Sequence, residues 1–403
     1  MARVTDEIIP YPRVFDDRLE VDPVFKDFQR DGLVRVQLPY GESCWLATRY
    51  EHVRSVYGDR RFSRAAGFEH DVPRVWAGSS LIDPSMPLAM DPPRHTRLRR
   101  LTSGAFSPRR IRELRAWVQR EIDDLLDHME QEGSPADFVL RFAWNLPIRV
   151  LAGIMGVPSE DISQFRHLVE TATGVSTLPE AREEASGQLN EFVIGLIAER
   201  RAAMQDDLLS DLVHATDDED RLDEAELLGL IMSLLAGGFE TTAWQLGSTA
   251  YALMDHQEHW RQLVDDPELL PNALEELWRW IPSFKYGTNF VRWASTDIEL
   301  SGGALVRAGE AVLPEHAVAN RDDSVFPHGW ELDFHRADPR PHLSLGFGAH
   351  FCMGANLANM QIALSVETLV RRYPNLRLAI PTEEVKWSES SFMRSVEVLP
   401  LAW

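Results

Sequence analysis

The stretch Gly346-Phe347-Gly348-Ala349-His350-Phe351-Cys352-Met353-Gly354 decides how the rest of the chain is interpreted. A helical pattern of apolar residues follows it as far as Leu369. Glycines let the backbone approach a large planar group closely, and the N-terminus of a helix favours the thiolate form of a cysteine. A lone cysteine in a long chain is nevertheless more often a small buried apolar residue than a ligand. Other motifs must therefore decide between these two roles.

Composition excludes several classes of protein. The 403 residues are 44% hydrophobic and 26% charged, which is typical of a globular protein, and the formal net charge is −22. So negative a chain repels nucleic acid and anionic membranes, and we expect neither as a partner. Two cysteines, Cys44 and Cys352, make no disulfide framework and indicate a reducing cytosol. The N-terminal segment lacks an apolar run, so we expect a soluble, cytoplasmic protein.

Hydrophobic periodicity predicts a mainly α fold with a small β region. Alternation over residues 33–38 and 44–48 around a turn predicts a hairpin that carries Cys44 as a packing residue. Further β-rich parts are expected near residues 284–313 and 376–403, and helices over most of the remainder. We expect one domain over residues 1–403. Residues 63–90 show little periodicity and predict a long functional loop, and residues 206–223 are expected to be acidic and exposed.

The longest periodic stretch, residues 227–253, predicts one central buried helix because it is apolar nearly all round. It contains Gly237-Gly238-Phe239-Glu240-Thr241-Thr242. Paired glycines inside a helix and a carboxylate in a buried helix both reduce stability. Such local conflicts usually mark a functional site. The alternative for Thr241 is a hydroxyl that bonds back to the preceding turn of the helix.

Two shorter helices carry charged pairs. His95 and Arg99 share one face of a helix that begins near Pro93, where they suit a pair of carboxylates or form a solvated basic face. Glu276 and Arg279 are three residues apart on another helix and can form an ion pair. Arginines are also concentrated in one region, which reverses the local charge: Arg94, Arg97, Arg99, Arg100, Arg109, Arg110, Arg112, Arg115 and Arg120.

Together these motifs resemble the cytochrome P450 family. The first stretch resembles the cysteine loop Phe-Gly-x-Gly-x-His-x-Cys-x-Gly, the central helix the oxygen-binding motif, and the charged pair the Glu-x-x-Arg motif. The resemblance covers most of the chain and implies the P450 fold, of the soluble bacterial kind that acts in natural-product pathways, macrolide tailoring above all. It departs from the family at Arg94, Phe239, Leu345, Asn359 and Gln361, none of which the chemistry needs.

The resemblance implies a haem b cofactor and a role for each motif. Cys352 would be the axial ligand of the iron, and Glu240 and Thr241 would handle protons. Glu276 and Arg279 would be structural, with Arg321 or Arg336 as a third member. The remaining cofactor-binding residues would be His95, Arg99, Arg292 and His350 at the propionates, with Gly237, Gly238, Gly346, Phe347, Gly348 and Gly354 around the ring.

The same resemblance suggests where substrate binds. Residues from several loops and from the central helix are candidates for contact, although a residue such as Trp76 could equally well only pack. They are Trp76, Leu88, Ala89, Leu234, Gly237, Ser283, Phe284, Asn289, Ser391 and Phe392.

The implied reaction is oxygen activation at a haem, with hydroxylation or epoxidation of a bulky polyketide or macrolide. Electrons would come from NAD(P)H through an external reductase and a ferredoxin, which would dock on the arginine-rich surface. One alternative is oxidative coupling of aromatic substrates, such as tryptophan-containing cyclic dipeptides. Another is a haem-binding sensor or carrier without catalysis, against which the proton-handling pair Glu240 and Thr241 argues.

Overall fold

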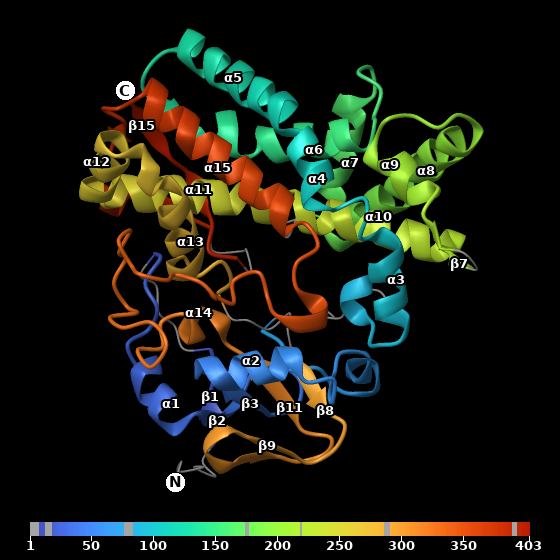
Figure 1. Ribbon diagram of the computed structural model, residues 1–403, viewed down its shortest axis with the longest axis vertical. Helices are drawn as coiled ribbons and strands as arrows, with labels where there is room; N and C mark the ends of the chain where they lie inside the picture. Colours follow the sequence, from blue (N-terminus) through green and yellow to red (C-terminus); the bar gives the residue numbers. More distant parts are fainter. Residues whose placement is uncertain are drawn as a thin grey trace. The chain divides into compact units, whose positions relative to one another are not determined.

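The computed structural model describes residues 8–12, 18–75, 84–173, 177–217, 220–285, 291–388 and 393–403. The chain forms two compact units, each assembled from separated segments (Figure 1). Unit 1 comprises Met1–Pro84, Leu88–Thr96 and Asn272–Cys352. Unit 2 comprises Ser85–Pro87, Arg97–Pro271 and Met353–Trp403.

Unit 1 is built on a six-stranded sheet of order β1-β2-β3-β11-β8-β4. The predicted hairpin is confirmed: β2 and β3 are antiparallel, and Leu33 faces Ala47. Strand β11 continues the sheet parallel to β3 and antiparallel to β8. The strands are β1 (Ile9–Pro10), β2 (Leu33–Gln37), β3 (Cys44–Ala47), β4 (Phe62–Ser63), β8 (Arg292–Ala294) and β11 (Ala311–Pro314), with a separate antiparallel pair β9 (Ile298–Leu300) and β10 (Ala304–Val306).

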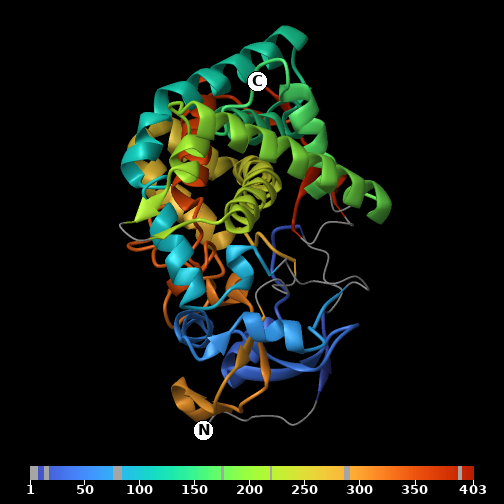
Figure 2. The same cartoon turned by 90° about the vertical axis from the view of Figure 1, so that its right-hand side faces the viewer.

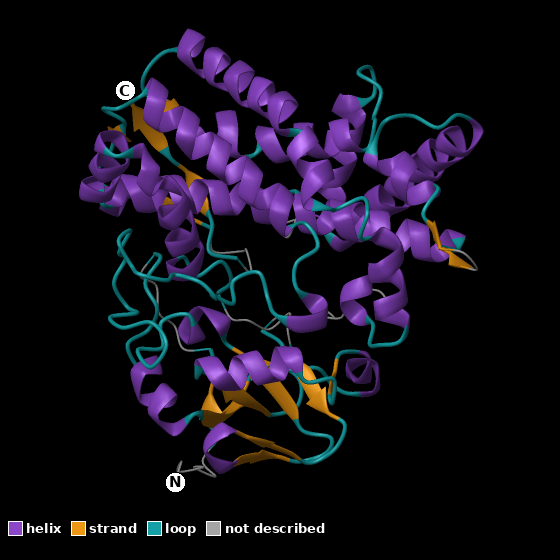
Figure 3. Ribbon diagram, viewed as in Figure 1, coloured by secondary structure: helices purple, strands orange, loops and turns teal. Residues whose placement is uncertain are grey.

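Helix α2 lies against this sheet (Figure 3) and buries Val53, Val56 and Tyr57 in a core with Trp45 and Val312. Cys44 is fully buried in the neighbouring core cluster, as the hairpin pattern predicted. Residues 63–75 and 84–90 are more ordered than expected, since they contain β4 and two short 3₁₀ helices. The other helices of this unit are α1 (Phe25–Asp31), α2 (Tyr50–Gly58), η1 (Ala65–Glu69), η6 (Ser301–Gly303), α14 (His316–Ala319) and η7 (Gly348–His350).

Unit 2 is a bundle of helices around α11, which Figure 2 views nearly end-on. From Thr242 to Met254 every residue of α11 is buried. The helices of the unit are α4 (Pro108–Glu113), α5 (Arg115–Glu132), η3 (Val139–Ala143), α6 (Asn145–Ile154), α7 (Ile162–Thr173), α8 (Pro179–Ala202), α9 (Leu208–Val213), α10 (Glu224–Gly238), α11 (Glu240–Asp255), α12 (Gln257–Asp265), η4 (Pro267–Leu269), α15 (Ala355–Arg372) and η8 (Thr382–Glu384).

Short sheets complete unit 2. Three helices contain a boundary between the two units, and the remaining boundaries lie in loops. The strands are β5 (Ala136–Asp137), β6 (Thr216–Asp217), β7 (Asp220–Arg221), β12 (Arg377–Leu378), β13 (Lys386–Trp387), β14 (Val396–Val398) and β15 (Pro400–Ala402). The helices that cross from one unit to the other are η2 (Pro87–Ala89), α3 (Arg94–Thr102) and α13 (Leu270–Trp280).

Two expectations about helices are corrected. The central helix is interrupted at Phe239, so that α10 ends at Gly238 and α11 begins at Glu240. Residues 206–223 are not simply exposed, because Asp207 is buried, caps α9 and accepts a hydrogen bond of 2.8 Å from the buried Arg200. By length and composition alone, Glu224–Asp255 is the one candidate membrane span in the described part of the chain, and over half of its most apolar window is buried.

Candidate active site

The cysteine loop of unit 1 is a tight turn closed by backbone hydrogen bonds. The amide of Cys352 donates to the carbonyl of Leu345 at 2.9 Å, and that of Phe351 donates to Gly348 at 3.1 Å. Gly346 and Gly348 adopt φ angles of +75° and +70°, in the left-handed region that favours glycine. The turn leaves the side chain of Cys352 exposed, three residues before α15 begins.

Gly348 also brings this loop into close contact with α2. A Cβ atom at Gly348 would lie 2.9 Å from the carbonyl oxygen of Tyr57. The neighbouring Phe347 ring packs near Gly58, and the guanidinium of Arg54 lies 4.9 Å from the centre of that ring. The close approach that the structure shows at Gly348 is therefore to α2, which holds the loop on the core of unit 1.

A buried charge cluster supports the segment that leads into the loop. Both carboxylate oxygens of Glu276 accept from Arg279 at 2.7 Å and from the Nε of Arg336 at 3.0–3.1 Å. The exposed fractions of these three side chains are 0%, 0% and 7%. Of the two arginines left open by the sequence, the third member is therefore Arg336. Arg321 instead pairs with Glu20 at 2.9 Å.

Asn320 connects the charge cluster to the cysteine loop. Its carbonyl accepts a hydrogen bond of 2.6 Å from Arg279. Its side-chain oxygen accepts from the amide of Leu343 at 2.7 Å, and its amide nitrogen donates to the hydroxyl of Ser344 at 2.8 Å. The side chain of Asn320 thus holds Leu343 and Ser344, two consecutive residues that lead into the cysteine loop. Sequence reasoning missed Asn320, because no local pattern shows that its side chain meets residues more than twenty positions away.

Positive groups gather in the same unit. Arg292 on β8 is buried, and its Nη1 donates to the carbonyl of Val291 at 3.3 Å. Burial, together with the nearby positive charge of Arg64, lowers the pKa of Arg292 well below its usual value. The ring of buried His95 lies 4.1 Å from that of His350, measured between centroids. Arg99, which belongs to unit 2, follows one turn after His95 on α3, as predicted.

Unit 2 contains the predicted oxygen-binding motif at the junction of α10 and α11. The hydroxyl of Thr241 donates to the carbonyl of Gly237, which is the local bond considered as an alternative from the sequence. Glu240 is buried as the first residue of α11. A Cβ atom at Gly238 would contact Leu151 at 3.3 Å, whereas one at Gly237 would meet no described atom within 4 Å beyond its own helix. Only Gly237 thus faces open space.

The candidate substrate contacts fall into three groups. Leu88 and Ala89 lie on η2, and Leu234 is partly exposed on α10. Ser283 is buried, and the ring of Phe284 packs edge-to-face against His316 at 5.6 Å. Trp76, Asn289, Ser391 and Phe392 lie outside the described residues.

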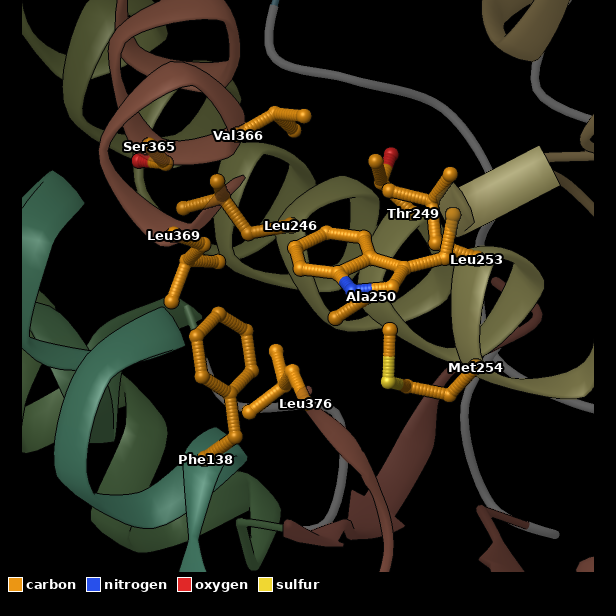
Figure 4. A pocket seen from close by; sticks show the side chains of 11 residues that line it. Phe138, Leu246, Thr249, Ala250, Leu253, Met254, Ser365, Val366, Leu369 and Leu376 are labelled. Carbon is orange, nitrogen blue, oxygen red and sulfur yellow. The ribbon is translucent and has the colours of Figure 1, made fainter. Parts of the chain in front are cut away.

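An apolar pocket elsewhere in unit 2 is distinct from these residues (Figure 4). It lies between the C-terminal half of α11 and α15, where Leu246, Leu253 and Leu369 line it. None of the predicted site residues in the described segments contributes to its lining.

The residues present fit a haem. The thiol that would ligate iron is exposed on a turn, as an axial ligand must be. In addition, Arg292 and Arg64 place two buried positive charges close together, an arrangement that the two carboxylates of a haem would stabilise. We find no cluster of three or more histidine, cysteine or acidic ligands for a separate metal ion in the described segments.

Comparison with known proteins identifies the family of the chain. The family model for cytochrome P450 matches residues 33–393. Nocardicin C N-oxygenase of Nocardia uniformis subsp. tsuyamanensis is 46% identical, over 92% of each chain. Mycinamicin IV hydroxylase/epoxidase of Micromonospora griseorubida is 42% identical, over 93% of each chain. The crystal structure of a cytochrome P450 with biaryl coupling reactivity, P450mel 107F1, superposes with a TM-score of 0.91 at 38% identity and covers 98% of this chain and 100% of that one.

The chain belongs to the cytochrome P450 family. The similarities confirm the P450 fold, the monooxygenase class and the natural-product type that the motifs predicted. They also confirm oxidation of a complex secondary metabolite as the function, and haem as the family's cofactor. The individual residue roles are proposals, which the contacts described above support.

Proposed function

We propose that this protein is a cytoplasmic haem-thiolate monooxygenase, a single domain over residues 1–403, that hydroxylates or epoxidises a bulky polyketide or macrolide. The observation that carries this proposal is the exposed thiol of Cys352 on a rigid glycine turn directly before α15. The relatives support a bulky natural product as substrate, since one is named for mycinamicin IV and another for nocardicin C.

Each part of the site has a role in this reaction. A bound haem b would supply reductive activation of dioxygen at its iron. Cys352 would ligate its iron, and Arg292 would donate to a propionate, together with His95, Arg99 and His350. Gly237, which faces open space on α10, would leave room for dioxygen, and Gly238 would pack against α6.

Glu240 and Thr241 would deliver protons. The Thr241 hydroxyl proton is directed at the Gly237 carbonyl, so the hydroxyl must turn away from that carbonyl to donate elsewhere. Buried Glu240 is the adjacent carboxyl that can return a proton to this hydroxyl.

The variant Thr241→Val tests this role because it removes the hydroxyl and keeps the shape, while Thr241→Ser keeps the hydroxyl. We expect Thr241→Val to consume NADPH with at least about tenfold less product per NADPH, in the range of a lost general acid. Thr241→Ser should stay close to the wild type. Unchanged coupling in Thr241→Val would refute proton delivery by Thr241.

Electrons would come from NAD(P)H through a reductase and a ferredoxin that docks on arginines of unit 2. Part of the predicted positive surface is neutralised within the protein. Arg110 pairs with Asp206 at 2.7 Å, and Arg115 pairs with Glu367 at 3.0 Å. Arg112 and Arg120 are exposed without an ion pair to any described residue, so they are the arginines most available to an acidic partner.

Titration of the ferric protein, followed at the Soret band, tests the substrate class. A fitting substrate displaces the ligand water and shifts the spin state, so we expect a saturable shift with mycinamicin-type macrolides. Oxidative coupling is the second candidate, favoured by the similarity to the biaryl-coupling P450. A shift with tryptophan-containing cyclic dipeptides alone would favour coupling, and the absence of oxygen-18 from the product would establish it.

A further inference from the structure

We propose that Arg64 is a positioning residue that holds together two segments of unit 1, the one that carries the candidate substrate contacts Leu88 and Ala89 and the one that leads from Val291 into strand β8, and so determines which bulky ligands the site accepts. Arg64 follows β4 directly and is not part of any motif recognised in the sequence. The inference rests on the proposed function, because it concerns the substrate side of the same site.

The guanidinium of Arg64 joins these segments directly. Its Nε donates to the carbonyl of Leu88 at 3.1 Å, and its Nη1 donates to the carbonyl of Val291 at 2.9 Å. Leu88 belongs to the first segment, next to Ala89, and Val291 begins the second, directly before Arg292 on β8. Because the guanidinium is planar and rigid, two of its N–H groups set the distance between the two carbonyls.

Arg64 is itself held at its backbone. Its amide donates to one oxygen of Asp91 at 2.8 Å, and the other oxygen accepts from the hydroxyl of Ser63 and from the amide of Ala65 at 3.3 Å. Asp91 lies three residues after Leu88 on the same segment. The segment is thus tied to Arg64 at two points, one through the backbone of Arg64 and one through its side chain.

Burying the charged side chain of Arg64 lowers the stability of the folded protein. The side chain is 7% exposed, and burial lowers its pKa to about 10. In the protein without haem, the neighbouring positive charge of Arg292 adds repulsion, which the nearby Tyr57 and Asp91 oppose. An apolar residue would avoid both costs, but it would leave two buried carbonyl groups without these donors. A lysine would keep the charge and lose the fixed spacing between its donors.

Hydrogen exchange tests the mechanical part of the proposal on the haem-loaded protein without substrate. The variants are Arg64→Gln, Arg64→Lys and, as a matched control, Arg60→Gln, which removes an exposed arginine four residues earlier. We expect exchange within residues 84–91 and 291–294 to be about tenfold faster in Arg64→Gln and intermediate in Arg64→Lys. Arg60→Gln should match the wild type. Equal exchange in all four proteins would overturn the proposal.

Ligand binding tests the specificity part. Imidazole is small enough to report on the iron alone, whereas 4-phenylimidazole also reaches the surrounding walls. We expect Arg64→Gln to change the Kd of 4-phenylimidazole about fivefold or more, which is about 1 kcal/mol, and that of imidazole less than about twofold. Equal changes for both ligands would indicate general damage and would overturn the proposal. If the wild type responds to neither azole, the proposed function fails, and hydrogen exchange still decides the role of Arg64.

Discussion

Replacing Glu276 with Gln is the sharpest test of the support beneath the cysteine loop. The substitution keeps the volume of the side chain and removes its negative charge. Two arginines, Arg279 and Arg336, then remain buried without their shared carboxylate, and the new amide group directs hydrogens toward their N–H donors. The amide of Asp333, which donates to the same carboxylate at 3.0 Å, is also affected.

The magnitude follows from the burial of the cluster. Removing one partner of a fully buried ion pair costs about 3–5 kcal/mol, because a charge is left without compensation. With an unfolding entropy of about 2.1 cal/mol/K per residue, this cost corresponds to a fall in Tm of about 4–6 °C for a chain of 403 residues. The matched control is Asp27→Asn, which breaks the exposed i,i+3 pair with Arg30 and should lower Tm by less than about 1 °C.

The assay is thermal unfolding of the haem-loaded variants, with the Soret absorbance followed in parallel. Since the cluster reaches the loop through Asn320, we expect Glu276→Gln to lose haem at a lower temperature as well. A Tm within about 1 °C of the wild type would refute the claim that this cluster is a main support of unit 1. A lower Tm with unchanged haem retention would refute the link through Asn320.

Three further predictions follow from burial and local geometry. Burial raises the pKa of Cys44 to about 12, so at pH 8 iodoacetamide should label only Cys352 in the native haem-free protein, and neither thiol once haem is bound, as mass spectrometry would show. Burial lowers the pKa of His316 to about 4 from an unfolded value near 6.5. The unfolded chain therefore binds a proton that the folded chain does not, and the stability of the fold falls as pH falls from 6.5 to 4. His316→Gln should reduce the loss of Tm between pH 7.5 and pH 5 by about 2 °C. Gly237→Ala should raise Tm slightly through helix propensity and weaken azole binding. Gly238→Ala should do neither, because its methyl group would contact the side chain of Leu151. Equal behaviour of both variants in thermal unfolding and azole titration would contradict this contrast.

The fold and the cysteine loop were predictable because both rest on local signals. Alternation specifies the β2–β3 hairpin, and the Ser107-Pro108 pair caps α4 as such pairs do. The break at Phe239 was not predicted, because the apolar periodicity of residues 227–253 continues across it. The choice of Arg336 over Arg321 also could not be made, because both arginines follow α13 at similar distances and only tertiary packing separates them.

The chemistry of the charge cluster explains why so costly an arrangement is present. After α14 ends at Ala319, the chain runs to Phe347 without a regular helix or strand, so its backbone carbonyl groups need other donors. Arg279 donates to the carbonyls of Asn320 and Gly329, and both Arg279 and Arg336 donate to that of Glu331.

Apolar side chains in these positions would pack, but they would leave the carbonyl groups buried and unsatisfied. Glu276 compensates the charges of the two guanidinium groups that donate to these carbonyl groups. Glu276, Arg279 and Arg336 therefore form one structural unit. The irregular segment is the base of the cysteine loop, since Asn320 holds Leu343 and Ser344. The position of the Cys352 side chain therefore depends on how guanidinium groups satisfy a backbone that has no secondary structure of its own.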